Sequence, residues 1–117
     1  GGNQVLIGQK AGYCQCNWGY GFTVIGACAS YTHNSGQLNT TVGFKANECA
    51  TSGSYNVFFG QVAGRKTTGN SNTYIGNCAA QCATSGSGNV AIGNCVMGSG
   101  CVSGANNVVI GSYVIVF

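Results

Sequence analysis

The stretch Ser85-Gly86-Ser87-Gly88-Asn89-Val90-Ala91-Ile92-Gly93-Asn94-Cys95-Val96 is one of seven copies of a repeat that runs through the whole chain. The copies align on a glycine that follows an aliphatic or aromatic residue. These anchor glycines, spaced 16 to 18 residues apart, are Gly8, Gly26, Gly43, Gly60, Gly76, Gly93 and Gly111. A period of this length predicts a solenoid in which each copy forms one coil.

Two other positions of the repeat are nearly constant. Seven residues before each anchor stands another glycine, at Gly1, Gly19, Gly36, Gly53, Gly69, Gly86 and Gly104. We expect both glycine positions to form corners, because glycine accepts positive φ and close backbone approach. Three residues after the first glycine stands an asparagine, at Asn39, Asn56, Asn72, Asn89 and Asn107. Stacked coils would let these side chains form an amide ladder.

The three residues before each anchor glycine predict a short strand. The first and third are mostly β-branched, as in Val90 and Ile92, and this period-2 spacing predicts that both point inward. Alanine or valine three residues after the anchor suits a narrow interior. A helix would lose about 1 kcal/mol at each glycine. We therefore predict an all-β parallel β-solenoid (β-roll or β-helix) of about seven coils, one repeat domain over residues 1–117, about 33 Å long.

The middle strand residue is then expected to face outward. In the seven copies it is Leu6, Val24, Thr41, Phe58, Tyr74, Ala91 and Val109. On a lone rod this column would be an exposed apolar stripe, which usually marks an interface. The sequence thus predicts an oligomer interface there, although a sheet that simply tolerates such residues is the alternative.

Composition excludes several classes of function. The net charge of +3 comes from four scattered cations and one acid, too few for a nucleic-acid groove, and no apolar run approaches the roughly 20 residues of a membrane helix. One histidine, His33, and one acid, Glu48, cannot supply a Ser-His-Asp triad or a carboxylate pair. We expect no enzyme activity, no catalytic residue, no metal and no cofactor.

Eight cysteines in 117 residues indicate an oxidising compartment. Equivalent residues of stacked coils lie about 4.8 Å apart, so Cys78 and Cys95 are disulfide candidates, and Cys82 and Cys101 could bridge the same two coils. The remaining candidates, with undetermined pairing, are Cys14, Cys16, Cys28 and Cys49. Buried thiols that fill gaps are the alternative. No second pair completes a zinc site around the C-x-C or C-x3-C spacings.

The repeat resembles the N-x-x-I-G-x-x-A-G repeats of phage and algal-virus fibre proteins and of fibre proteins with a self-cleaving chaperone. Asn56 to Gly64 and Asn89 to Gly93 carry this likeness, which covers essentially the whole chain. It is also similar to the shorter repeats of trimeric autotransporter adhesin heads. The resemblance implies a trimeric stalk with a structural or adhesive role. The longer repeat, the absence of a coiled-coil or chaperone segment and the eight cysteines depart from it.

We therefore expect a structural fibre segment at an extracellular or virion surface, cut from a longer or filament-forming protein. Its partner would be itself, as a homotrimer or a head-to-tail filament. Adhesion to cell-surface glycan through Trp18, Tyr20 and Tyr31 is compatible with this role. An ice-binding β-solenoid is the alternative, although Val57 interrupts the threonine column of Thr40 and Thr73.

Overall fold

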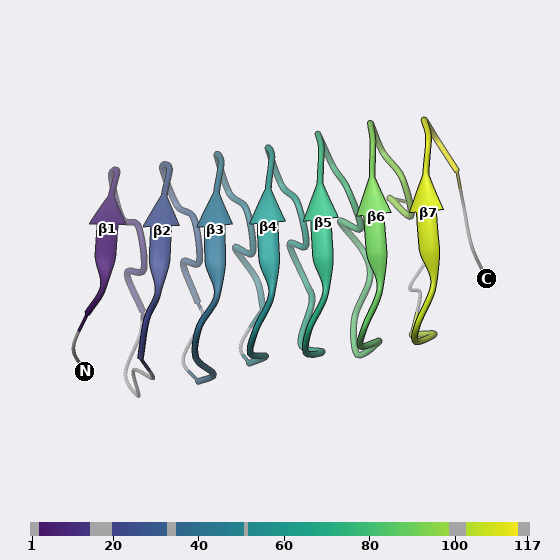
Figure 1. The fold of residues 1–117 in the computed structure, drawn as a ribbon. Coiled ribbons are helices and arrows are strands. Elements are labelled where there is room, and N and C mark those ends of the chain that lie inside the picture. Colours follow the sequence, from purple (N-terminus) through teal and green to yellow (C-terminus); the bar gives the residue numbers. More distant parts are fainter. Residues whose placement is uncertain (1–2, 15–19, 33–34, 51, 99–102, 115–117) are drawn as a thin grey trace.

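Seven short parallel strands form one sheet in a computed structural model that describes residues 3–14, 20–32, 35–50, 52–98 and 103–114. The chain winds as a β-solenoid of about six turns, and the strands follow one another in sequence order (Figure 1). They are β1 (Val5–Ile7), β2 (Thr23–Ile25), β3 (Thr40–Val42), β4 (Val57–Phe59), β5 (Thr73–Ile75), β6 (Val90–Ile92) and β7 (Val108–Ile110). The predicted fold class is confirmed.

The register of the sheet repeats without a slip. Each first strand residue pairs with the first residue of the next strand, as Val57 does with Thr73 and Thr73 with Val90. The long axis of the molecule is 36 Å and its cross-section is 22 by 18 Å, close to the predicted rod. Equivalent positions of the repeat therefore form continuous columns along the stack.

Left-handed backbone at fixed positions closes each coil. Every anchor glycine has φ between 127° and 151°. A Cβ on Gly76 would stand 2.2 Å from the carbonyl oxygen of Gly93, the equivalent glycine of the next coil. Glycine is required here because the backbone conformation and the close approach of the next coil both exclude a side chain. The expected corner at this position is confirmed.

The strand orientation predicted from the sequence is wrong. The middle residues point into the coil: Val24, Thr41, Phe58, Tyr74 and Ala91 are 0 % exposed, and Val109 is 6 % exposed, while Leu6 of the first strand is 42 % exposed. The first and third residues face outward. The middle column was assigned to the surface because the flanking β-branched columns were assigned to the interior. Its side chains vary from alanine to tyrosine, and a second interior column compensates for that variation.

That compensating column lies four residues after the anchor glycine. Gly64 accompanies the large Phe58, Ala80 accompanies Tyr74, and Met97 accompanies the small Ala91. A Cβ on Gly64 would meet the Phe58 ring at 2.3 Å. A large side chain in one column is therefore paired with a small one in the other, so each coil fills a similar interior volume. Close-packed cores require such a match.

The interior holds two apolar clusters. The larger one extends from Ala46 to Val109 and contains Phe58, Tyr74 and Met97. The smaller one consists of Phe22, Val24 and Ala29, with the half-buried Ala11 packed against it. The predicted small column after the anchor glycine is confirmed, since Ala29, Ala46, Ala63, Ala79 and Val96 are all buried.

A polar layer occupies the interior around β2 and β3. The buried Ser30 hydroxyl donates to the Thr41 hydroxyl at 3.3 Å, and the Asn47 amide donates to the Ser30 hydroxyl at 3.4 Å. Buried polar groups need such partners to offset the loss of water. This layer belongs to neither apolar cluster.

Candidate interaction surfaces

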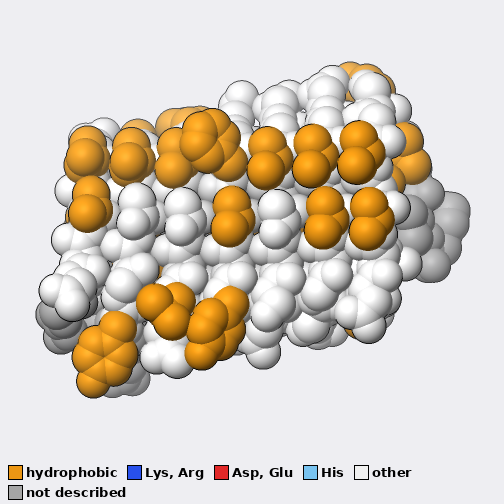
Figure 2. Space-filling model, viewed as in Figure 1, with side chains coloured by type: hydrophobic (Ala, Val, Ile, Leu, Met, Phe, Trp, Pro, Cys, Tyr) orange, Lys and Arg blue, Asp and Glu red, His pale blue; other side chains and the backbone are white. Residues whose placement is uncertain are grey.

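The outward side of the sheet is a flat, uncharged and largely apolar surface, which we call the strand face. It consists of the first and third strand residues: Val5, Ile7, Thr23, Ile25, Thr40, Val42, Val57, Phe59, Thr73, Ile75, Val90, Ile92, Val108 and Ile110. Figure 2 shows the third residues as one unbroken hydrophobic row above a row in which valine and threonine mix. Exposure is greatest at the end strand β7, where Val108 is 71 % exposed.

The sequence placed an oligomer interface on the wrong residues. Leu6, Val24, Thr41, Phe58, Tyr74, Ala91 and Val109 are the middle strand residues, and all except Leu6 are buried in the coil. Buried side chains are not available to a partner. An exposed apolar stripe does exist, but the flanking columns of the strand face form it.

The predicted asparagine ladder is present, with backbone partners in place of amide stacking. The Asn72 side chain donates to the Gly86 carbonyl of the next coil at 2.9 Å. Its Oδ1 atom accepts from the Asn89 backbone amide at 2.9 Å. The same two bonds recur at Asn39, Asn56 and Asn89. Only at the end of the ladder does one asparagine side chain, that of Asn107, donate to another, that of Asn89.

This ladder is buried and joins each coil to the next. Asn39, Asn56, Asn72 and Asn89 are at most 1 % exposed. In the coil of β2, the same position holds Phe22, which belongs to the smaller apolar cluster. The ladder is therefore a structural element of the coils from β3 onward, and it offers no polar group to a ligand.

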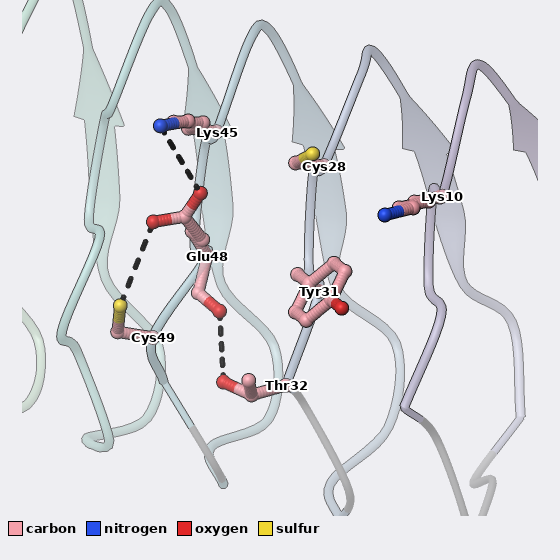
Figure 3. Close-up of a pocket in the computed structure, with 7 residues that line it drawn as sticks. All are labelled: Lys10, Cys28, Tyr31, Thr32, Lys45, Glu48 and Cys49. Carbon is pink, nitrogen blue, oxygen red and sulfur yellow. Dashed lines mark hydrogen bonds and ion pairs between the residues drawn. The ribbon is translucent and has the colours of Figure 1, made fainter.

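A surface pocket of about 360 Å³ lies on another side of the stack, over the coils of β1 to β3. Lys10, Cys28 and Lys45 are equivalent residues of these coils, two residues after their anchor glycines, and all have left-handed backbone. Figure 3 shows the Cys28 thiol in the coil between those of the two lysines, with Tyr31 below it. Thr32, Glu48 and Cys49 complete the lining.

The single acid of the chain organises the charges beside this pocket. Glu48 pairs with Lys45 at 3.8 Å and with Arg65 at 3.3 Å. The Cys49 thiol lies 3.7 Å from a Glu48 oxygen. The pKa of Arg65 is raised, mainly by negative charge on Cys49 and to a smaller extent by the Glu48 carboxylate. Burial acts in the opposite direction and lowers this pKa. The carboxylate is thus engaged by cations and is not placed as a general base.

Aromatic side chains are exposed near the same coils. The rings of Tyr13 and Tyr31 stack with centroids 5.2 Å apart, and the Lys10 ammonium lies 5.8 Å from the Tyr13 ring centre. Tyr20 is 66 % exposed at another corner of the stack. Trp18 and His33, two residues that the sequence singled out, lie outside the described residues.

No disulfide joins two of the described cysteines. The described cysteines are Cys14, Cys28, Cys49, Cys78, Cys82 and Cys95. The other two candidates, Cys16 and Cys101, lie outside the described residues, so the predicted Cys82–Cys101 bridge is not tested. The predicted Cys78–Cys95 disulfide is not formed, although the two residues occupy equivalent positions of neighbouring coils.

Neither a metal centre nor a membrane span is found in the part of the chain that the structure describes. It contains no group of three or more His, Cys, Asp or Glu side chains placed to hold a metal. It also contains no helix of the length and apolarity needed to cross a membrane. Comparison with protein families, with curated proteins and with solved structures gave no match to this chain.

Proposed function

We propose that this chain is a structural segment of a fibre or stalk, at an extracellular or virion surface, that associates with further copies of itself. The observation that carries the proposal is the strand face, which presents valine, isoleucine and threonine along all seven strands without one charge. Contiguous exposed apolar patches larger than a few hundred Å² mark interaction sites. The partner that fits is a second uncharged surface of the same chemistry.

The parallel sheet gives a second argument for a partner. In α/β proteins, purely parallel sheets have both faces covered by helices. Here one face packs on the coil interior and the other is open. Seating another copy on the strand face would complete the cover.

The dimensions fit an interface between copies. A side of the stack that is 36 Å long and 22 Å wide measures roughly 790 Å². Stable interfaces bury about 800 Å² on each partner. One long side therefore has the area that a specific contact requires, provided that the partner covers it along its full length. The resemblance to trimeric adhesin heads favours three copies packed side by side over a head-to-tail filament.

The chemistry of the pocket supports a non-enzymatic role. The only acid, Glu48, is held by Lys45 and Arg65. None of the described residues forms the nucleophile and base pair that acyl transfer uses. We propose that the chain has no enzyme activity.

Sedimentation equilibrium tests the self-association. We expect the native chain to sediment at a multiple of its 11.8 kDa mass. Ile92→Lys on the strand face should raise the dissociation constant of the oligomer at least about tenfold, because a buried unpaired charge is costly. Ser85→Lys, an exposed residue away from the strand face, is the matched control and should leave the mass unchanged. A native chain that stays monomeric across the concentration range would contradict the proposal.

An adhesive role would use the aromatic residues of the first coils. The Tyr13–Tyr31 stack beside the pocket offers flat ring surface next to the Lys10 ammonium. A saccharide with an acidic group suits this chemistry, and cell-surface glycan is the proposed partner. Binding to a glycan array should be lost in Tyr31→Ala and kept in Tyr55→Ala, whose exposed ring lies outside the pocket.

Ice binding is the second candidate, and the strand orientation favours it. Because the first strand residues face outward, Thr23, Thr40 and Thr73 lie on the open strand face and not in the interior. Threonine and valine then repeat at the regular spacing of the sheet on a flat surface. Thermal hysteresis that is present in the native chain and lost in Thr73→Lys would favour this function over the fibre.

A further inference from the structure

Cys78 and Cys95 form a pair of stacked thiols in the same column as Lys10, Cys28 and Lys45, but further along the stack, on the coils of β5 and β6. Both residues stand two positions after their anchor glycines, and both have left-handed backbone, with φ of 57° and 53°. The Cys95 amide donates to the carbonyl of Asn77 at 2.8 Å, which fixes the two coils in register. Both side chains are half-buried, so solvent reaches them.

The spacing of the coils suits a bridging metal as well as a disulfide, and the structure has no disulfide between these two residues. Equivalent residues of parallel strands lie about 4.8 Å apart. A disulfide accepts Cα atoms about 4.4 to 6.8 Å apart, so this separation does not exclude one. Two metal–thiolate bonds of about 2.3 Å in a straight line place the sulfur atoms about 4.6 Å apart. A linear two-coordinate ion therefore matches two parallel thiols with little movement of the backbone.

The charge around the pair selects a divalent ion. No Lys, Arg, His, Asp or Glu follows Lys66 in the sequence, so the coils of β5 and β6 carry no charged side chain of their own. Burial first, and then the Cys95 thiol, raise the pKa of Cys78. Two thiolates around a doubly charged cation give a neutral complex, which suits uncharged surroundings.

Amide side chains hold the two thiols in place. The Cys78 sulfur lies 3.7 Å from the Asn77 Oδ1 atom, and the Cys95 sulfur lies 3.6 Å from the Asn94 Oδ1 atom. The Asn77 amide donates to Asn94 Oδ1 at 3.1 Å. These contacts orient the two thiols, and they end when the thiols lose their protons because an amide oxygen can only accept. The four side chains form one hydrogen-bonded group across two coils.

We propose that Cys78 and Cys95 form a two-thiolate site for a soft divalent ion that prefers linear coordination, the class that Hg(II) represents. Binding forms two metal–sulfur bonds and releases both thiol protons to solvent, with no change in oxidation state. Zinc is disfavoured because it requires four ligands. The site does not depend on the fibre function, and its occupant would link the coils of β5 and β6.

The test uses a chain in which the other cysteines are serine and only this pair remains. The replaced residues are Cys14, Cys16, Cys28, Cys49, Cys82 and Cys101. Mercuric chloride is the probe, glutathione is the competing monothiol, and native mass spectrometry with a proton-release assay is the readout. Cys78→Ser removes one ligand. Adding Val62→Cys to that variant restores two thiols in the same column but two coils apart, about 9.6 Å, as a spacing control.

We expect the chain to bind one mercury ion and to release two protons. It should keep the ion at glutathione concentrations about 100-fold higher than those that remove it from either control, because the second metal–sulfur bond is intramolecular. Equal sensitivity to glutathione in all three chains would overturn the site. So would a native chain that is isolated with these two residues already oxidised to a disulfide. If the six-serine chain does not fold, peptide mapping of mercury adducts in the natural chain and in its Cys78→Ser variant makes the same comparison.

Discussion

The coils of β1 to β3 and those of β4 to β7 have the same backbone and register but different chemistry. The first group lines the pocket with Lys10, Lys45 and Glu48 and has a polar layer inside. The second carries charge only on its first coil, at Arg65 and Lys66, and encloses most of the larger apolar cluster, including Phe58 and Tyr74. The repeat geometry therefore depends on the shared glycine and alanine columns, which leaves the other columns free to vary.

The largest effect is expected where the two groups are alike. Gly76→Ala places a Cβ 2.2 Å from the Gly93 carbonyl oxygen, and Gly26→Ala places one 2.5 Å from that of Gly43. Both also force alanine into positive φ. Each should lower the free energy of unfolding by about 2 to 6 kcal/mol, measured by urea denaturation. A small effect in only one group would show that the anchor glycines do not play the same role in both.

Core truncation should separate the two clusters. Phe58→Ala removes a buried ring from the larger cluster and should lower the free energy of unfolding by about 3 to 5 kcal/mol. Val24→Ala in the smaller cluster should lower it by about 2 kcal/mol.

The compensation between columns predicts coupling at Phe58. Gly64→Ala should destabilise the native chain more than the Phe58→Ala chain, by about 1 kcal/mol, because its Cβ would meet the Phe58 ring at 2.3 Å. A double-mutant cycle in denaturant measures this difference. Strict additivity would mean that the two interior columns do not share one volume.

The asparagine ladder should contribute more in its centre than at its end. Asn72→Ala leaves the Gly86 carbonyl and the Asn89 backbone amide without their side-chain partners. This change should lower the free energy of unfolding by about 2 to 4 kcal/mol. Asn107→Ala removes only the side-chain bond from a half-buried residue to Asn89 Oδ1 and should lower the free energy of unfolding by about 1 kcal/mol. Thermal unfolding followed by circular dichroism checks both, and equal losses would be inconsistent with a ladder that matters through burial.

The buried Tyr74 should make stability depend on alkaline pH. Burial raises the pKa of Tyr74 to about 12, and the Asn89 side chain acts weakly in the opposite direction. The tyrosine of the unfolded chain ionises near pH 10. The stabilisation that comes from keeping Tyr74 protonated is therefore complete below pH 10. As the pH rises from 10 to 12, the free energy of unfolding falls by about 2 to 3 kcal/mol. Tyr74→Phe should remove this part of the pH dependence, while Tyr55→Phe, at an exposed ring, should not.

The smallest effect concerns the charged side chains at the junction of the two groups, where Glu48 of the β3 coil meets Arg65 of the β4 coil. Glu48→Gln breaks the ion pairs with Lys45 and Arg65, which are partly exposed. Pairs of this kind contribute about 0 to 1 kcal/mol. The change in thermal midpoint should be small and should vanish in high salt. A large loss would assign the pocket a structural role that its geometry does not indicate.

The repeat period, the anchor glycines and the asparagine ladder were predictable because each depends on one residue type at one position. The strand orientation was not, because no single column reveals the interior. The signal that could have found it is the inverse size of two columns: Phe58 with Gly64, and Ala91 with Met97. A three-residue strand is too short for alternation alone to decide which face is buried.

The pocket was missed for a different reason. Lys10, Cys28 and Lys45 lie 17 or 18 residues apart in sequence and come together only because the coils stack in register. Lys10 and Lys45 share their repeat position with Cys28, Cys78 and Cys95, so no constant residue type marks this position. Aligning every position of the repeat, charged ones included, would have shown the group.

Small-angle X-ray scattering tests the central claim, side-by-side association through the strand face, most directly. A single chain has a Cα radius of gyration of 12.4 Å and a cross-section of 22 by 18 Å. The account predicts that the native chain in solution has a larger radius of gyration and a wider cross-section, and that Ile92→Lys returns both toward the single-chain values. A native chain with the dimensions of one stack at every concentration would contradict it.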